Sequence, residues 1–183
     1  MGFYLQPFDN EYLFRSISAF RSTEIDYASD TDHSPIDFLH IEYHDEYDQT
    51  TQEFQIISPD GERFKYVAGL YYYKQQADTD RAVINGPALL FLGVTGPVTN
   101  AGLVDTDSLA GYVSGSYDFN DVLRLGFGGR YSKETKDVLW NLDGSLSGAF
   151  ALGSTAPGGL SDSRTDTNFS PTASLTVSFS ELT

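Results

Sequence analysis

All three histidines of the chain lie in one strongly acidic stretch. His33, His40 and His44 fall between Glu24 and Asp48, a segment with nine Asp or Glu residues and no Lys or Arg. Imidazole nitrogens bind transition metals and carboxylate oxygens bind Ca²⁺, so a bound ion or a metal-bearing ligand would be sought here first. We take the three histidines as candidate ligand-binding residues.

The spacing of these residues does not support a dedicated metal site. Asp30 and Asp32 stand like the first two donors of a calcium loop, but the glycine turn and the closing Glu are missing. His40 and His44 would share one face of a helix, yet no His-Glu-x-x-His pattern accompanies them. We therefore predict no resident metal and no cofactor, with a solvated acidic segment as the alternative to ligand binding.

Three other side chains are candidates for contact with a ligand. Trp140 stands between Gly- and Ser-rich segments, and an exposed indole ring is a flat binding platform, although a position at a membrane interface or packing against loops is the alternative. Arg124 and Arg130 share one parity of their segment. They could attract an anion or hold another domain through its carboxylates, or they could pair with acids such as Glu53.

Catalysis and nucleic-acid binding find little support. The chain has no Gly-x-Ser-x-Gly motif, no phosphate-binding loop and no Cys, and three histidines in one acidic stretch do not predict a Ser–His–Asp triad. The net charge is −15, from 26 acidic and 11 basic residues, whereas phosphate contacts need clustered Lys and Arg. We predict a protein that is not an enzyme and does not bind nucleic acid.

The elements that must position these residues are β-strands. From Asn168 to Ser180, apolar and small polar residues alternate without interruption. Successive side chains of a strand point to opposite faces, so this segment has one apolar face and one polar face. The span from Phe169 to Phe179 covers ~33 Å of strand, or about 25 Å along a membrane normal at a tilt of ~40°. That length matches the apolar band of an outer-membrane barrel.

A second segment repeats the pattern. Leu125 and Phe127 share one face of 123–132, whereas Arg124 and Arg130 share the other. No apolar run approaches the ~20 residues of a membrane helix, so a membrane-spanning form of this chain has to be a barrel. The competing interpretation is a soluble β-sandwich, in which a second sheet would cover the apolar face.

The pattern predicts an all-β chain, an antiparallel up-and-down meander of about six strands that forms part of a transmembrane β-barrel. The expected strands are about 12–26, 49–58, 64–77, 106–119, 122–136 and 165–180. Short turns alternate with three long connectors, about 27–48, 78–105 and 137–164. Long loops are uncommon in compact soluble domains but usual on the external side of outer-membrane barrels.

In their order and spacing, these segments resemble the barrel of a TonB-dependent outer-membrane receptor. The resemblance rests on residues 13–21, 52–59, 64–73, 110–119, 125–134 and 169–175, and it covers most of the chain outside the long connectors. It implies a protein of the bacterial outer membrane that contacts lipid and lipopolysaccharide. It also implies import of a scarce nutrient, by default a metal–siderophore complex, driven by the TonB complex.

Members of that family have a barrel of about 22 strands around an N-terminal plug, through which the TonB complex acts. This sequence shows no plug and no TonB box, so we expect residues 1–183 to be a partial receptor barrel domain within a larger protein. Two alternatives remain at this point: a plugless porin-like channel or adhesin, and a soluble β-sandwich binding module.

Overall fold

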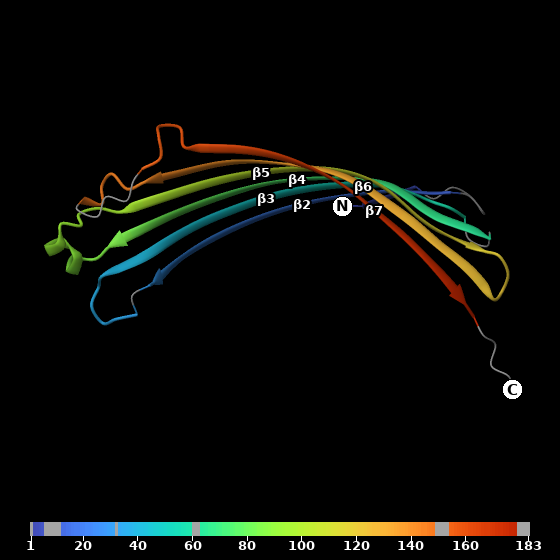
Figure 1. Ribbon diagram of the computed structural model, residues 1–183, viewed down its shortest axis with the longest axis horizontal. Coiled ribbons are helices and arrows are strands. Elements are labelled where there is room, and N and C mark those ends of the chain that lie inside the picture. The colour runs from blue at the N-terminus through green and yellow to red at the C-terminus, as the bar shows by residue number, and fades with distance from the viewer. Residues whose placement is uncertain (1, 6–11, 32, 60–62, 149–153, 179–183) are drawn as a thin grey trace.

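The computed structural model of the chain describes residues 2–5, 12–31, 33–59, 63–148 and 154–178. These residues form one curved antiparallel sheet in which each strand pairs with the next strand along the chain (Figure 1). The strands are β1 (Gly2–Leu5), β2 (Leu13–Asp30), β3 (Leu39–Ile57), β4 (Phe64–Asn85), β5 (Val98–Asp118), β6 (Leu123–Asp143) and β7 (Leu160–Val177). A 3₁₀ helix, η1 (Pro87–Leu92), lies between β4 and β5. The predicted all-β meander is confirmed: β2 to β7 are its six long strands, and β1 adds a short one.

The strands are much longer than the sequence predicted. β3 begins at residue 39 rather than about 49, and β4 ends at residue 85 rather than about 77. The three long connectors therefore shrink to 31–38, 86–97 and 144–159. The extra length was missed because both faces of these extensions carry many polar side chains, which removes the apolar alternation that marks a half-buried strand. The last two residues of the strand predicted at 165–180 lie outside the described residues.

The pairing register sorts the side chains into two faces. One row of cross-strand partners runs Phe54, Leu70, Gly111, Tyr131 and Phe169 across β3 to β7. We call the face that carries this row the outer face, and the opposite face the inner face. Along much of β4 the outer-face residues are exposed and the inner-face residues are half-buried.

Most of the large apolar side chains on the outer face lie at one end of the strands, with exceptions beyond it such as Phe20, Leu103 and Leu139. In β4 they run from Phe64 to Tyr72, and the next outer-face residue is Lys74. We call the outer-face rows from Leu123 up to Tyr72 the apolar band, and the parts of the strands beyond it the extensions. The band covers ~33 Å of strand, or about 25 Å along the normal at a tilt of ~40°. This is the height of the apolar zone of a membrane barrel.

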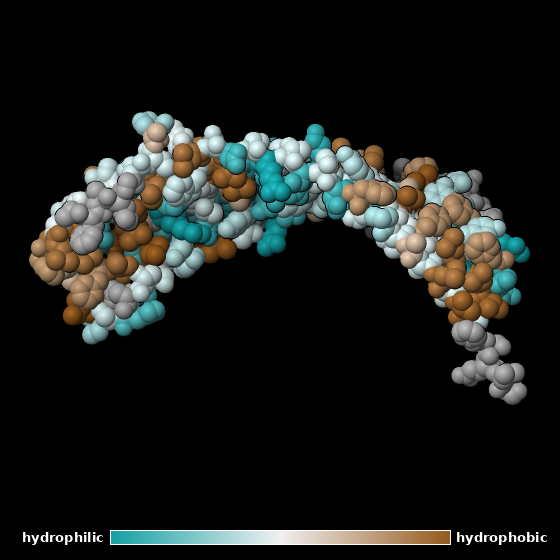
Figure 2. Space-filling view, viewed as in Figure 1, coloured by the Kyte–Doolittle hydropathy of each residue, from teal (hydrophilic) through white to brown (hydrophobic). Residues whose placement is uncertain are grey.

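The sheet has almost no core of its own. Among the described residues, the buried apolar side chains are Val94, Val98 and Ala110, whereas Leu70 is 59% and Phe169 is 63% exposed. All described strands lie in a single sheet, so no second sheet covers the apolar band there as a β-sandwich would require. Figure 2 shows hydrophobic residues gathered at both ends of the sheet and hydrophilic residues over the middle of the strands. No helix in the described part of the chain is long and apolar enough to cross a membrane.

Candidate ligand-binding face

A polar network lies on the inner face, behind the apolar band. The Glu53 carboxylate oxygen Oε1 accepts hydrogen bonds from the Tyr112 hydroxyl at 2.6 Å and from the Gln55 amide at 3.0 Å. Arg15 donates from Nη1 to the Gln55 carbonyl oxygen at 3.4 Å, which extends the network to β2. Ionisable groups are costly in hydrocarbon, so this face suits water or another protein domain rather than lipid.

Gly69 makes this network possible. Tyr112 belongs to β5 and Glu53 to β3, so the tyrosine side chain has to cross β4, where its cross-strand partner is Gly69. A Cβ atom at residue 69 would lie 2.6 Å from the Tyr112 ring carbon Cζ. The glycine therefore leaves the space in which the aromatic ring lies across the neighbouring strand, an arrangement known from other sheets in which an aromatic residue covers a glycine.

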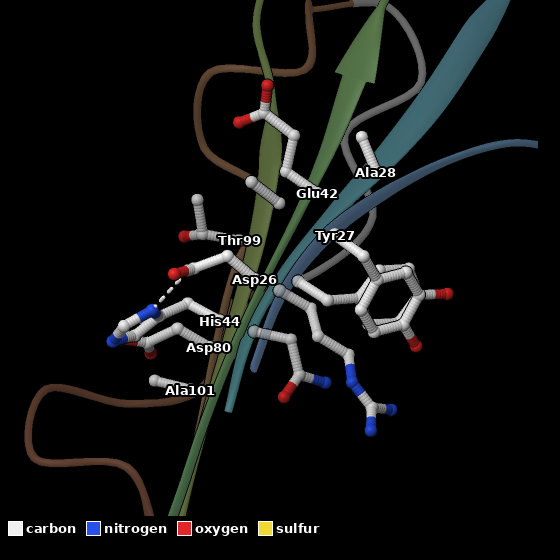
Figure 3. A pocket seen from close by; sticks show the side chains of 12 residues that line it. Asp26, Tyr27, Ala28, Glu42, His44, Asp80, Thr99 and Ala101 are labelled. Atoms are coloured by element: carbon white, nitrogen blue, oxygen red, sulfur yellow. Dashed lines mark hydrogen bonds and ion pairs between the residues drawn. The ribbon is translucent and has the colours of Figure 1, made fainter. Parts of the chain in front are cut away.

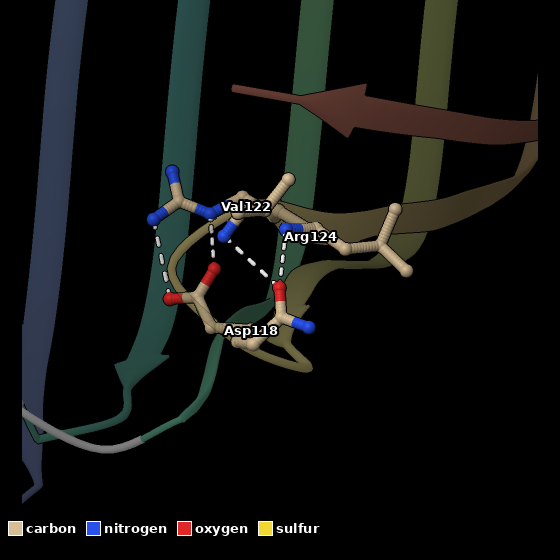
Figure 4. Close-up of polar contacts among 5 residues, drawn as sticks. Asp118, Val122 and Arg124 are labelled. Carbon is tan, nitrogen blue, oxygen red and sulfur yellow. Dashed lines mark hydrogen bonds and ion pairs between the residues drawn. The ribbon is translucent and has the colours of Figure 1, made fainter. Parts of the chain in front are cut away.

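Both candidate arginines lie on the inner face, but they have different surroundings. The Arg130 guanidinium lies 5.5 Å from the centroid of the Tyr71 ring, and it forms no ion pair with Glu53 in the described part of the chain. Arg124 forms an ion pair with Asp118 across the turn between β5 and β6 (Figure 4). Arg124 thus holds a turn at the start of β6, whereas Arg130 lies farther along the same strand.

The same turn is fastened by an asparagine. The Asn120 side-chain oxygen accepts hydrogen bonds from the backbone N–H groups of Val122 at 2.9 Å and Leu123 at 2.8 Å (Figure 4). Asn and Asp side chains often close tight turns in this way. The contacts of Arg124 are therefore those of a structural residue at the short-turn end.

Aromatic and cationic side chains gather on the inner face of the extensions. The rings of Tyr27 and Tyr43 stack with centroids 4.2 Å apart, and the Arg81 guanidinium lies 5.3 Å from the Tyr43 centroid. Trp140 donates from Nε1 to the Asn100 side-chain oxygen at 2.8 Å. We call Tyr27, Tyr43, Arg81, Asn100 and Trp140 the inner-face cluster.

A buried carboxylate lies next to this cluster. Asp45 follows Tyr43 at the next inner-face position of β3, and it is only 8% exposed. Within the described residues its Oδ1 atom has no hydrogen-bond partner. An unpaired buried carboxylate oxygen is costly, so this position favours a hydrogen-bond donor from a bound molecule or from a rotated neighbouring side chain.

A hollow in the extensions of β2 to β5 is lined by residues from both faces of the sheet. Its lining includes Tyr27, Tyr43, Arg81 and Asn100 from the inner face, but also outer-face residues such as His44. Figure 3 shows the tyrosine pair on one side of the strands and His44, bonded to Asp26, on the other. We treat the two sides as different surfaces because the sheet itself separates them.

The three histidines are not brought together. His33 lies in the connector after β2 with a left-handed φ of 51°. His40 and His44 share the outer face of β3, but four residues of strand separate them by about 13 Å. His40 Nε2 lies 3.6 Å from a Glu42 carboxylate oxygen instead. The helical spacing that drew attention to His40 and His44 therefore has no meaning in a strand.

His44 finds its partners across the strand pair. Its Nδ1 atom lies 2.6 Å from Asp26 Oδ1, and one ligand atom each of Glu24, Asp26 and His44 lies within 4.8 Å of the others. The hydrogen bond and the charge of Asp26 raise the pKa of His44 above its ordinary value. All three side chains are exposed, and nothing else in the described part of the chain points to an ion there, so we assign none.

Most members of the inner-face cluster were missed by sequence reasoning, because Tyr27, Tyr43, Arg81 and Asn100 fall in segments taken for loops. A signal was present in residues 41–48. The even-numbered positions are all polar, whereas Ile41, Tyr43 and Tyr47 occupy three of the four odd-numbered positions. This alternation is that of a strand whose two faces both meet water but carry different side chains.

Comparison with known proteins supports the fold and nothing finer. No protein-family model and no curated protein sequence matches this chain. A solved structure, the ferric yersiniabactin uptake receptor FyuA from Yersinia pestis, superposes with a TM-score of 0.67 at 18% identity, over 92% of this chain. The chain spans 23% of the length of that receptor. The described sheet therefore shares the fold of one portion of an outer-membrane receptor barrel.

Proposed function

We propose that residues 1–183 form part of the barrel wall of a TonB-dependent outer-membrane receptor that imports a metal–siderophore complex. The observation that carries this proposal is the apolar band, which has the height of a bilayer on one face of an open antiparallel sheet and a polar network on the other. In such a wall the outer face contacts lipid and the inner face lines the lumen.

The kind of cargo is proposed from the inner-face cluster. Stacked tyrosines, a guanidinium and an indole offer flat apolar surface together with positive charge, which suits a large chelate that carries aromatic rings and acidic groups. The FyuA receptor takes up a ferric complex according to its name, which agrees with this choice. Two further residues are candidate contacts. His33 lies in the connector after β2, and Arg130 lies deeper on the inner face.

The proposal also assigns a division of labour. This chain supplies wall and part of the vestibule, whereas a plug and the TonB complex would supply occlusion and energy. Glu53, Tyr112 and Arg15 are the inner-face residues that such a plug would meet at the depth of the membrane. A porin-like channel would use the same wall without a plug.

The first experiment is to determine the nucleotide sequence on both sides of this reading frame. We expect an upstream segment that encodes a signal peptide and a plug of about 100–150 residues, the size of one domain. Downstream we expect further amphipathic strands. Further strands without a plug would contradict the receptor and support the porin-like channel.

The second experiment measures transport by the full-length protein. A strain without its own siderophore receptors would express the gene and be given ⁵⁵Fe as ferric yersiniabactin, a ferric catecholate or a ferric hydroxamate. We expect the double variant Tyr43→Ala/Arg81→Ala to raise the concentration for half-maximal uptake by about tenfold, as the loss of a contact residue does. Glu42→Ala, on the opposite face beside Tyr43, is the matched control. Uptake of none of the three complexes by the unmodified protein would contradict the proposed cargo.

A further inference from the structure

Two lysines stand at the upper rim of the apolar band, on the outer face. Each follows the last aromatic residue of the band with one residue between: Tyr72 is followed by Lys74, and Tyr131 by Lys133. Both are exposed, one on β4 and one on β6. The same Tyr-x-Lys order therefore marks the rim on two strands that flank β5.

These are the only basic residues on the outer face of the described strands. The register places the other basic residues of the strands on the inner face: Arg15, Arg21, Lys65, Arg81, Arg124, Arg130, Lys136 and Arg164. Basic side chains are thus absent from every outer-face row except the two rows at the rim. A random scatter of lysines over this face would not give that arrangement.

Neither lysine is neutralised in the part of the chain that the structure describes. No carboxylate forms an ion pair with Lys74 or Lys133 there. Asp107 is the cross-strand partner of Lys74, but its carboxylate accepts a hydrogen bond from the Tyr72 hydroxyl at 3.0 Å. Among the described residues neither ammonium group is therefore held in a direct ion pair, and the Asp107 carboxylate is the one acidic group in the row of Lys74 on β4 to β6.

The two positions are close enough to act on one lipid. Lys133 lies in the row of Tyr72 and Leu109, and Lys74 lies one row above it on the other side of β5. Two strand spacings across and one row up separate the two Cα atoms by about 12 Å, which the long side chains can close. An anionic group at the height of the rim would meet both.

From this arrangement we propose that Lys74 and Lys133 bind the phosphate groups of lipid A, the phosphorylated glycolipid headgroup of lipopolysaccharide in the outer leaflet. The proposal rests on the proposed function, because it needs the apolar band in the outer membrane. Acyl chains then lie against the band, and the headgroup phosphates meet the ammonium groups at its upper edge. The tyrosines at the rim provide the amphipathic rings that membrane interfaces favour.

The charge above the rim explains why the contact is restricted to this height. The outer-face rows beyond the lysines carry Asp78, Asp80, Asp105 and Asp137, and further along β2 they carry Glu24 and Asp26. These acids repel an anionic saccharide core, whereas the lysine rows attract phosphate. A lipid with its phosphates next to the acyl chains fits this order of charges, and a lipid with its charge farther out does not.

The test uses the full-length protein in lipid nanodiscs that contain lipid A with two phosphates, lipid A without phosphates, or phosphatidylglycerol. Native mass spectrometry would measure the lipid that stays bound. We expect Lys74→Gln/Lys133→Gln to weaken retention of phosphorylated lipid A about thirtyfold, and each single change about fivefold. Lys65→Gln, on the inner face near the opposite end of β4, is the matched control. The conservative variant Lys74→Arg/Lys133→Arg should retain the lipid.

Three outcomes would overturn the proposal: equal retention by the double variant, equal binding of lipid A without phosphates, and equal binding of phosphatidylglycerol. The first two would mean that the band holds acyl chains without help from the lysines. Failure of the proposed function is separately visible, since a protein outside the membrane would not float with outer-membrane vesicles. Normal flotation and iron uptake together with equal retention would reject the lysine contact alone.

Discussion

The apolar band forms the lower part of the strands and the extensions form the upper part, and the two parts share one backbone conformation although their outer-face side chains differ. In the apolar band, the outer face of β4 carries Phe64 and Leu70. Farther along the strand, the same face carries Gln76 and Asp80. The backbone hydrogen-bond ladder continues without a break through both parts. Pairing therefore depends on the backbone, and in the proposed receptor the side chains of each part match the medium around it.

The largest effect should come from placing a charge in the lower part. We expect Ala68→Arg, on the outer face near the middle of the band, to lower the free energy of unfolding of the full-length protein in lipid vesicles by about 2–4 kcal/mol, the cost of a cation near the middle of a bilayer. Asp78→Arg, on the same face of the same strand, should change it by less than about 0.5 kcal/mol. Guanidinium titration followed by tryptophan fluorescence measures both. Equal effects of the two variants would show that the outer face of the band does not meet lipid.

The next effect concerns the crossing of β4 by Tyr112. Gly69→Ala should cost about 1–3 kcal/mol, because the added methyl group overlaps the tyrosine ring and forces it off its position. Gly111→Ala is the control, since its Cβ would meet only a Leu70 methyl carbon at an ordinary 3.6 Å. The same unfolding titration applies, and a Gly69→Ala protein as stable as Gly111→Ala would contradict the close contact.

A smaller loss is expected when the hydroxyl alone is removed. Tyr112→Phe should lower the unfolding free energy by about 1–2 kcal/mol, because it deletes a hydrogen bond to the Glu53 carboxylate and keeps the ring. Tyr71→Phe, also on the inner face, leaves the ring that lies beside Arg130 and should be nearly neutral. If both variants behave alike, the network contributes nothing measurable.

The smallest effect lies in the upper part and depends on pH. The pKa of His44 is raised in the folded protein by its hydrogen bond to Asp26 and by the charge of that carboxylate. The stabilisation is therefore fully present below the unfolded-state pKa and is lost as the pH rises through the folded-state value. An NMR titration of the imidazole should show the raised pKa, and Asp26→Asn should lower it. Asp30→Asn, on the same face, should leave the titration curve in place.

The sequence predicted the lower part better than the upper part. Period-two alternation of apolar residues identified β6 within one residue at its start, because the band imposes one apolar and one polar face. The same criterion failed for 39–48 and 78–85, where Glu42, His44 and Asp80 share a face that meets water. Hydropathy cannot distinguish such a strand from a loop, although the alternation of Tyr43 and Tyr47 with acidic residues was visible in the sequence.

The candidate site was less predictable than the fold, because it depends on register. The sequence correctly put Arg124 and Arg130 on one face, since parity alone decides that. It could not show that Tyr27 stacks on Tyr43, or that Tyr112 passes Gly69 to reach Glu53, because these contacts join segments whose pairing was unknown. Parity follows from local sequence, whereas cross-strand neighbours follow only from the complete register.

In the proposed receptor, the length of the strands beyond the apolar band would set the height at which a ligand is first met. From Tyr73 to Asn85, β4 rises about 40 Å along its own direction, or about 30 Å along the normal at a tilt of ~40°. A molecule held by Tyr27 and Tyr43 would therefore rest well above the lipid headgroups, at the level of the surrounding surface polysaccharides. It would then enter the lumen between the extended strands, which would separate it from those polymers before it reached the depth of the bilayer.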